Sequence, residues 1–175
     1  MKPDPSVVWF ALAFACVLPA KAAETKSASL DPEYVAVLRS GDVRKLRDAL
    51  DNGASANARD ASGNTPLMHA AAYGDLSCLR LLVDRGAEVN AGNSAGATAL
   101  MRAALDPEKV AFLLDRGADV KARSGLGNTP LMLAARPWNS HRAVELLLSQ
   151  GADAKDTNQF GATALMAAAA GGDEK

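Results

Sequence analysis

The large apolar residues of this chain recur at the spacing of one face of a helix. They lie at positions i, i+3 and i+4 within residues 76–83, and again within residues 144–148. This spacing places them on one side of an α-helix. Segments rich in Gly, Asn and Ser, such as residues 88–96, separate the helical stretches and predict turns or short hairpins. The pattern therefore predicts short amphipathic helices joined by turns.

The helical pattern is part of an internal repeat. One phrase occurs four times, as GNTPLMHAAAYGD at 63–75, GATALMRAALDPE at 96–108, GNTPLMLAARPWN at 127–139 and GATALMAAAAGGD at 161–173. A second phrase keeps step with it, as LLVDRGAEVNA at 81–91, LLDRGADVKA at 113–122 and LLLSQGADAKD at 146–156. The threonines of the first phrase lie 33, 31 and 34 residues apart. The chain is therefore an array of similar units.

The repeated phrases predict where helices begin and end. A threonine hydroxyl can accept a free backbone N–H at a helix start, and Pro66 or Pro130 after it has no N–H to leave unpaired. The following Leu-Met-x-Ala-Ala places large and small apolar side chains side by side, which lets two helices approach closely. Gly74-Asp75 interrupts the helical pattern, and glycines such as Gly86 suit a left-handed C-terminal cap. Each unit is therefore expected to hold two helices.

A period near 33 residues with Thr-Pro-Leu at this place resembles the ankyrin repeat. The resemblance implies an all-α repeat solenoid in which each unit is a turn or hairpin followed by two antiparallel helices. It covers residues 31–175, and we expect units 1 to 5 at 31–59, 60–92, 93–123, 124–157 and, incomplete, 158–175. The family's usual histidine after Thr-Pro-Leu is replaced by an apolar methionine in all four phrases, at Met68, Met101, Met132 and Met166.

The units differ most between their two helices. Unit 3 is two residues short there, and Asp106-Pro107 can cap its second helix. Unit 4 is one residue long and carries Arg136-Pro137-Trp138-Asn139-Ser140. Unit 1 begins with Asp31-Pro32 and exposes several basic side chains, so we expect it to be the polar N-terminal cap that a repeat array needs. The basic side chains are Arg39, Arg44, Lys45 and Arg47.

The N-terminus has the pattern of a secretory signal. Lys2 precedes an apolar run at 7–20, and Ala20-Lys21-Ala22 offers small residues at the cleavage positions. We therefore expect residues 1–22 to be a cleaved signal peptide, 23–30 a short linker, and the protein to be exported, periplasmic or secreted, from a bacterium. A membrane anchor would need a longer run. A lipoprotein would use Cys16, but the bulky Phe14 before it is unsuitable.

Charge and cysteine content narrow the class of partner. The formal net charge is −1, which argues against a nucleic-acid partner. Once the signal peptide is removed, no membrane contact is expected. Cys78 would then be a lone cysteine in an oxidising compartment, so stability has to come from packing rather than from disulfides.

The sequence offers no catalytic, cofactor-binding or metal-binding set, and we expect a protein that is not an enzyme. His141 and Glu145 lie four residues apart without a third ligand, which favours a solvated pair over a metal site. His69 is expected on the surface, because no nucleophile accompanies it. Cys78 is expected to be a half-buried apolar residue, and Gly125-Leu126-Gly127 a hairpin turn rather than a phosphate loop.

The resemblance implies binding of another protein through the hairpin tips and the exposed face of each first helix. Carried over by position, the candidate residues are Ser62, Asn64, Tyr73, Leu126, Asn128, Arg136, Trp138 and Phe160, with Ala72, Ala95, Ala97 and Leu105 beside them. Aromatic residues and arginine dominate binding hot spots. Binding is favoured for Tyr73 and Trp138, and binding and packing between units are weighed equally for Phe160. Phe112 and Tyr34 are expected in the core.

Two functions remain open from the sequence. One is an exported, non-enzymatic protein-binding module. The other is the scaffold or targeting part of a longer exported protein with a catalytic or redox domain beyond residue 175. Residues 161–175 match the first half of a unit, with Leu165 and Met166 as its core pair, so we expect the natural chain to continue and residues 171–175 to fray. A small hydrolase or metal enzyme is a third, weaker alternative.

Overall fold

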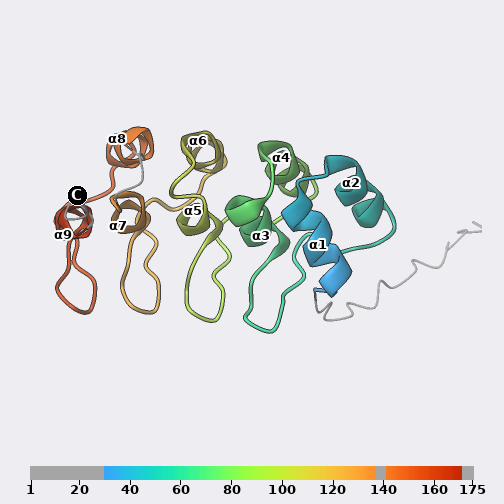
Figure 1. Ribbon diagram of the computed structural model, residues 1–175, viewed down its shortest axis with the longest axis horizontal. Coiled ribbons are helices and arrows are strands. Elements are labelled where there is room, and N and C mark those ends of the chain that lie inside the picture. Colours follow the sequence, from blue (N-terminus) through green and yellow to red (C-terminus); the bar gives the residue numbers. More distant parts are fainter. Residues whose placement is uncertain (1–29, 137–140, 171–175) are drawn as a thin grey trace, which may run out of the picture.

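The helices stack in pairs to form an elongated all-α array. The computed structural model describes residues 30–136 and 141–170. The first helices of the units are α1 (Pro32–Ser40), α3 (Pro66–Tyr73), α5 (Ala99–Arg102), α7 (Pro130–Ala134) and α9 (Ala164–Ala169). The second helices are α2 (Val43–Asp51), α4 (Leu76–Asp84), α6 (Pro107–Asp115) and α8 (His141–Ser149). The two sets form parallel rows, with hairpin-shaped loops beyond the row of first helices (Figure 1). The predicted solenoid is confirmed.

The first helices begin at the predicted threonines. In four units the threonine Oγ1 accepts the backbone N–H of the methionine three residues later, at 3.3–3.4 Å. Proline follows the threonine in α3 and α7, as expected. The second helices α2, α4 and α6 start at aspartates, and Asp106 with Pro107 caps α6 as predicted. The local capping signals are therefore confirmed.

The core lies between the two rows of helices. The leucines of α3, α4, α5 and α6 are its centre, and Leu67, Leu79, Leu82 and Leu113 are wholly buried. Tyr34 and Phe112 are buried, as predicted. Met68, Met101 and Met132 are buried too, which confirms that methionine supplies apolar filling in units 2 to 4. Cys78 is 0% exposed, so the expectation that it is only half-buried is wrong.

Neighbouring units are also joined at the hairpin tips. Each tip donates a backbone N–H to the tip before it, from Ser94 to Ser62, from Gly125 to Ala95 and from Gln159 to Leu126, at 2.8–3.1 Å. These bonds bring the loops into close contact. A Cβ on Gly96, which has a φ of +69°, would lie 2.9 Å from the backbone nitrogen of Gly125. Glycine is therefore required at this tip both by conformation and by space.

Asparagine side chains join the second half of one unit to the next. The Asn57 amide donates to the carbonyl of Gly86 at 2.9 Å and accepts the N–H of Glu88 at 2.8 Å. Asn90 makes the same two contacts one unit later, with Gly117 and Asp119. Each amide thereby pairs backbone groups at the C-terminal end of the next second helix.

Unit 5 has a different environment from the others. In the described residues its α9 packs on α7 through one side, and Ala164 is buried. Leu165 is 77% exposed and Met166 59% exposed, although the equivalent Leu67 and Met68 of unit 2 are buried. The predicted signal peptide, most of the predicted linker and the predicted frayed segment at 171–175 lie outside the described residues.

This difference predicts unequal effects of the same substitution at equivalent positions. We expect Leu67→Ala to lower the free energy of unfolding by about 2–5 kcal/mol, because it leaves a cavity in a closed core. We expect Leu165→Ala to change it by less than about 0.5 kcal/mol, because its side chain meets mainly solvent. Urea unfolding of both variants measures the difference. Equal losses would show that α9 has cover that this arrangement lacks.

Candidate binding surface

One side of the array is hollowed. We call it the first-helix face: the exposed side of α1, α3, α5, α7 and α9 together with their hairpin tips. Three hollows lie along it, with volumes of about 240, 490 and 550 Å³. The first lies over α1, α3 and α5, the second over α3, α5 and α7, and the third over α7 and α9. The hollows follow one another along the row of first helices.

The first hollow is polar and contains two arginines. The Arg39 guanidinium lies over the ring of Tyr73, 5.1 Å from its centroid, a cation–π contact. Arg102 donates to the side-chain oxygen of Asn64 at 3.1 Å. Tyr73 is 58% exposed, so its ring remains available beside the hollow.

The floor of this hollow contains a histidine–aspartate pair. His69 Nε2 lies 2.9 Å from Asp60 Oδ2, and the histidine is only 7% exposed. The expectation that His69 lies on the surface is therefore wrong. It is covered because the preceding loop folds over α3 and brings Asp60 to it. Burial disfavours the charged carboxyl, but hydrogen bonds from Asn64, His69 and Ser62 outweigh it and lower the pKa of Asp60 to about 2.

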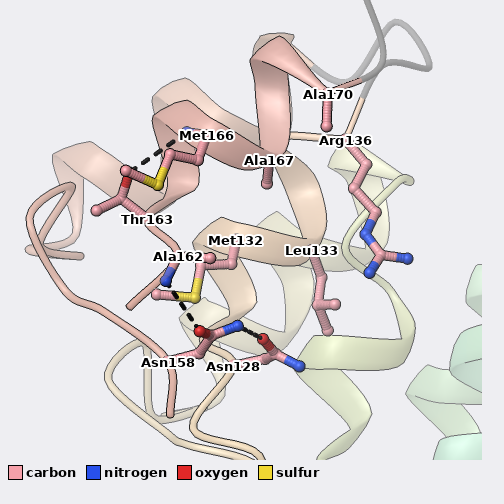
Figure 2. A pocket seen from close by; sticks show the side chains of 10 residues that line it. All are labelled: Asn128, Met132, Leu133, Arg136, Asn158, Ala162, Thr163, Met166, Ala167 and Ala170. Carbon is pink, nitrogen blue, oxygen red and sulfur yellow. Dashed lines mark hydrogen bonds between the residues drawn. The ribbon is translucent and has the colours of Figure 1, made fainter. Parts of the chain in front are cut away.

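The second and third hollows are mainly apolar. Alanines, Met101, Leu105 and Leu133 line the second, between Arg102 and Arg136. Figure 2 shows the third, with Met132 and Met166 above the hydrogen-bonded Asn128 and Asn158, and Arg136 at its edge. Arg136 thus belongs to both hollows, and apolar surface lies on either side of its charge.

The structure brings most of the predicted binding residues to this face. Tyr73, Leu126 and Phe160 are exposed by 58%, 50% and 75%. The high exposure of Phe160 excludes the alternative that it packs between units. Ser62 and Arg136 are also exposed. Trp138 lies outside the described residues.

Asn64 and Asn128 are at the face, but their side chains are already engaged within the array. Asn64 donates to Asp60 at 2.9 Å and accepts from Asn93 at 2.7 Å. Asn128 accepts from Asn158 at 2.8 Å. These amides therefore connect neighbouring loops, whatever else they contact.

Sequence reasoning missed Arg102 and treated Arg39 only as part of a polar cap. A position-by-position comparison of units contains the missing signal. Arg39 and Arg136 are aligned in the repeat, and Arg102 stands where unit 2 has His69. All three positions belong to first helices or their ends, so a strict alignment would have placed the three arginines on one face.

The groups considered for chemistry remain isolated from one another. Burial raises the pKa of the Cys78 thiol, which keeps it protonated and unreactive. His141 and Glu145 are exposed on α8. Within residues 30–136 and 141–170, no three His, Cys, Asp or Glu side chains gather as a metal site would require. In the same ranges, no helix has both the length and the apolar character to cross a membrane.

Comparison with known proteins identifies the repeat. A family model described as ankyrin repeats (3 copies) matches residues 34–124 and 106–175. A search of curated proteins finds no match.

The Asp60 contacts predict a pH-dependent contribution to stability. The pKa of Asp60 is about 2 when folded and close to the ordinary aspartate value of about 3.9 when unfolded. Its contribution is thus fully present above about pH 4 to 5 and is lost as pH falls towards 2. We expect the stability difference between wild type and Asp60→Asn to shrink over this window in urea unfolding. A difference that stays constant from pH 5 to 2 would contradict the proposed network.

Proposed function

The chain belongs to the ankyrin repeat family, and we propose that it is a non-enzymatic module that binds another protein through its hairpin tips and first-helix face. Ankyrin repeats generally mediate protein–protein interaction, and the family is typically non-enzymatic. The family alone does not choose a face of this chain. That choice rests on where its exposed apolar side chains lie.

The distribution of exposed apolar side chains carries the proposal. Among the described residues, the large apolar side chains with the greatest exposure lie on first helices, on the turns after them or on hairpin tips, with Leu148 of α8 as the exception. They are Tyr73, Leu105, Leu126, Phe160, Leu165 and Met166. Covering such residues removes apolar area from water, which stabilises a complex by roughly 25 cal/mol per Å². Contiguous apolar surface of this kind is typical of interaction sites.

Capture from the source organism tests the chosen face. The immobilised protein should retain a partner from an envelope extract, and Tyr73→Ala with Phe160→Ala should weaken its binding about tenfold or more, as for hot-spot aromatics. Leu148→Ala is the matched control, because it removes an exposed apolar side chain from a second helix. Quantitative mass spectrometry of the retained proteins gives the readout. If both variants retain every partner equally, the face is wrong.

We also propose that the protein acts outside the cytoplasm, in the periplasm or beyond. The support is the pattern of residues 1–22, with Lys2, an apolar run too short to span a bilayer and a small-residue cleavage site. A binding module in that compartment gains from having no exposed thiol, and Cys78 is wholly buried.

N-terminal sequencing of the mature protein tests export directly. We expect the purified envelope form to begin at Ala23, because Ala20 and Ala22 are the small residues before the cleavage point. The control is Ala22→Arg, which should block processing. Recovery of a wild-type chain that still begins at Met1 in the cytoplasmic fraction would overturn the proposal.

A further inference from the structure

Three arginines on the first-helix face lack carboxylate partners. Within the described residues, Arg39, Arg102 and Arg136 take part in none of the ion pairs. Other arginines of the array do have such partners. The pairs are Arg85 with Asp51, Arg116 with Asp84 and Arg123 with Asp156. The charge of the first-helix face is therefore available to a ligand.

The face has little negative charge of its own to neutralise these arginines. Asp60 is the one carboxylate among the described residues that line the three hollows. Its two oxygens already accept hydrogen bonds from Ser62, from the backbone and side chain of Asn64, and they contact His69. Asp60 is thus used inside the unit, and the guanidinium groups remain uncompensated although the whole chain has a net charge of −1.

Apolar surface lies between the positive charges. Tyr73 lies under Arg39, and the hollow of about 490 Å³ between Arg102 and Arg136 is lined by Met101, Leu105 and Leu133 together with alanines. A ligand that fits this face needs negative groups for the arginines and apolar groups for the hollows between them.

We propose that the first-helix face binds an extended segment of a partner protein that carries both carboxylate and apolar side chains. This inference rests on the proposed function and names the chemistry of the partner. Arginine binds carboxylates through two parallel N–H donors, which favours such a segment over a neutral one.

The stacking of the helices sets the length of the segment. Arg39 follows from α1 and Arg136 from the end of α7, three steps along the row of first helices (Figure 1). Packed helices lie about 8–10 Å apart, so these arginines are roughly 25–30 Å from one another. An extended chain covers this distance with about eight or nine residues at about 3.3 Å each. The carboxylates are therefore expected near the ends and in the middle of a segment of that length.

A nucleic acid fits these observations less well. Phosphate backbones need a dense run of positive charge, and three arginines over this distance supply little of it. The apolar hollows between them would also remain unfilled by a sugar–phosphate chain. An acidic peptide uses both features of the face.

Fluorescence anisotropy with synthetic peptides tests the proposal on the purified chain. The probe is a labelled peptide of about nine residues with glutamate at both ends and in the middle and leucines between them. The comparison peptides carry glutamine or lysine at those three places, and a single-stranded DNA oligonucleotide is the fourth probe. We expect the glutamate peptide to bind about tenfold or more tightly than the glutamine peptide, and to weaken as salt is raised.

Matched charge variants locate the binding. Arg39→Gln with Arg102→Gln and Arg136→Gln should weaken the glutamate peptide about tenfold. The control, Arg44→Gln with Arg47→Gln and Arg142→Gln, removes the same charge from exposed positions on α2 and α8 and should change binding less than about twofold. Circular dichroism and urea unfolding check that both variants are folded. Arg39→Gln with Arg136→Gln avoids the Arg102–Asn64 bond if the triple variant is unstable.

Several outcomes would overturn the inference. They are equal binding of glutamate and glutamine peptides, no binding of the glutamate peptide, equal losses in the two triple variants, or tighter binding of DNA than of the glutamate peptide. These results can be distinguished from failure of the proposed function. A captured partner that depends on Tyr73 and Phe160 but not on the three arginines would sustain the protein-binding module and reject the acidic segment.

Discussion

Each helix pair in this chain can bury its apolar side only against the pairs before and after it. The clearest sign is the contrast between two equivalent leucines, since Leu67 is wholly buried between neighbours whereas Leu165 is 77% exposed on α9. The two residues have the same local sequence and the same threonine cap. Their environments differ because burial depends on the next unit along, as in other repeat arrays. The fold is thus a sum of local units and of contacts between adjacent units.

Polar groups that join the units shape the surface that remains. The tip backbones, Asn57 and Asn90 all bond to a neighbouring unit. Unit 3 has Lys121 at the position of these asparagines, and the junction that follows is joined instead by Arg123 and Asp156. Most amide side chains of the loops are therefore committed to the array. What the first-helix face offers a ligand is its arginines and apolar side chains, which the stacking does not use.

Most of the fold could be predicted from the sequence, because its signals are local and repeated. The threonine and aspartate caps, the glycines after the second helices and the leucine spacing act within one unit, and the period shows how the units follow one another. The binding surface was less predictable. His69 was misplaced because its burial depends on Asp60, nine residues earlier, folding back over α3. Arg102 was missed because its meaning depends on arginines in other units, which only the stacked arrangement brings to one face.

The departures from the repeat explain why this surface can vary while the core stays constant. Unit 3 lacks two residues between its helices, and α5 is only four residues long, yet Leu100 and Leu113 stay buried. The shortening is absorbed where Asp106 and Pro107 start α6 at once, and it leaves Leu105 53% exposed beside the second hollow. A change at this turn alters the ligand-facing side without opening the core. Stacking constrains the leucines and the caps, whereas the ends of the first helices are free to differ, and the side chains that would distinguish one partner from another lie there.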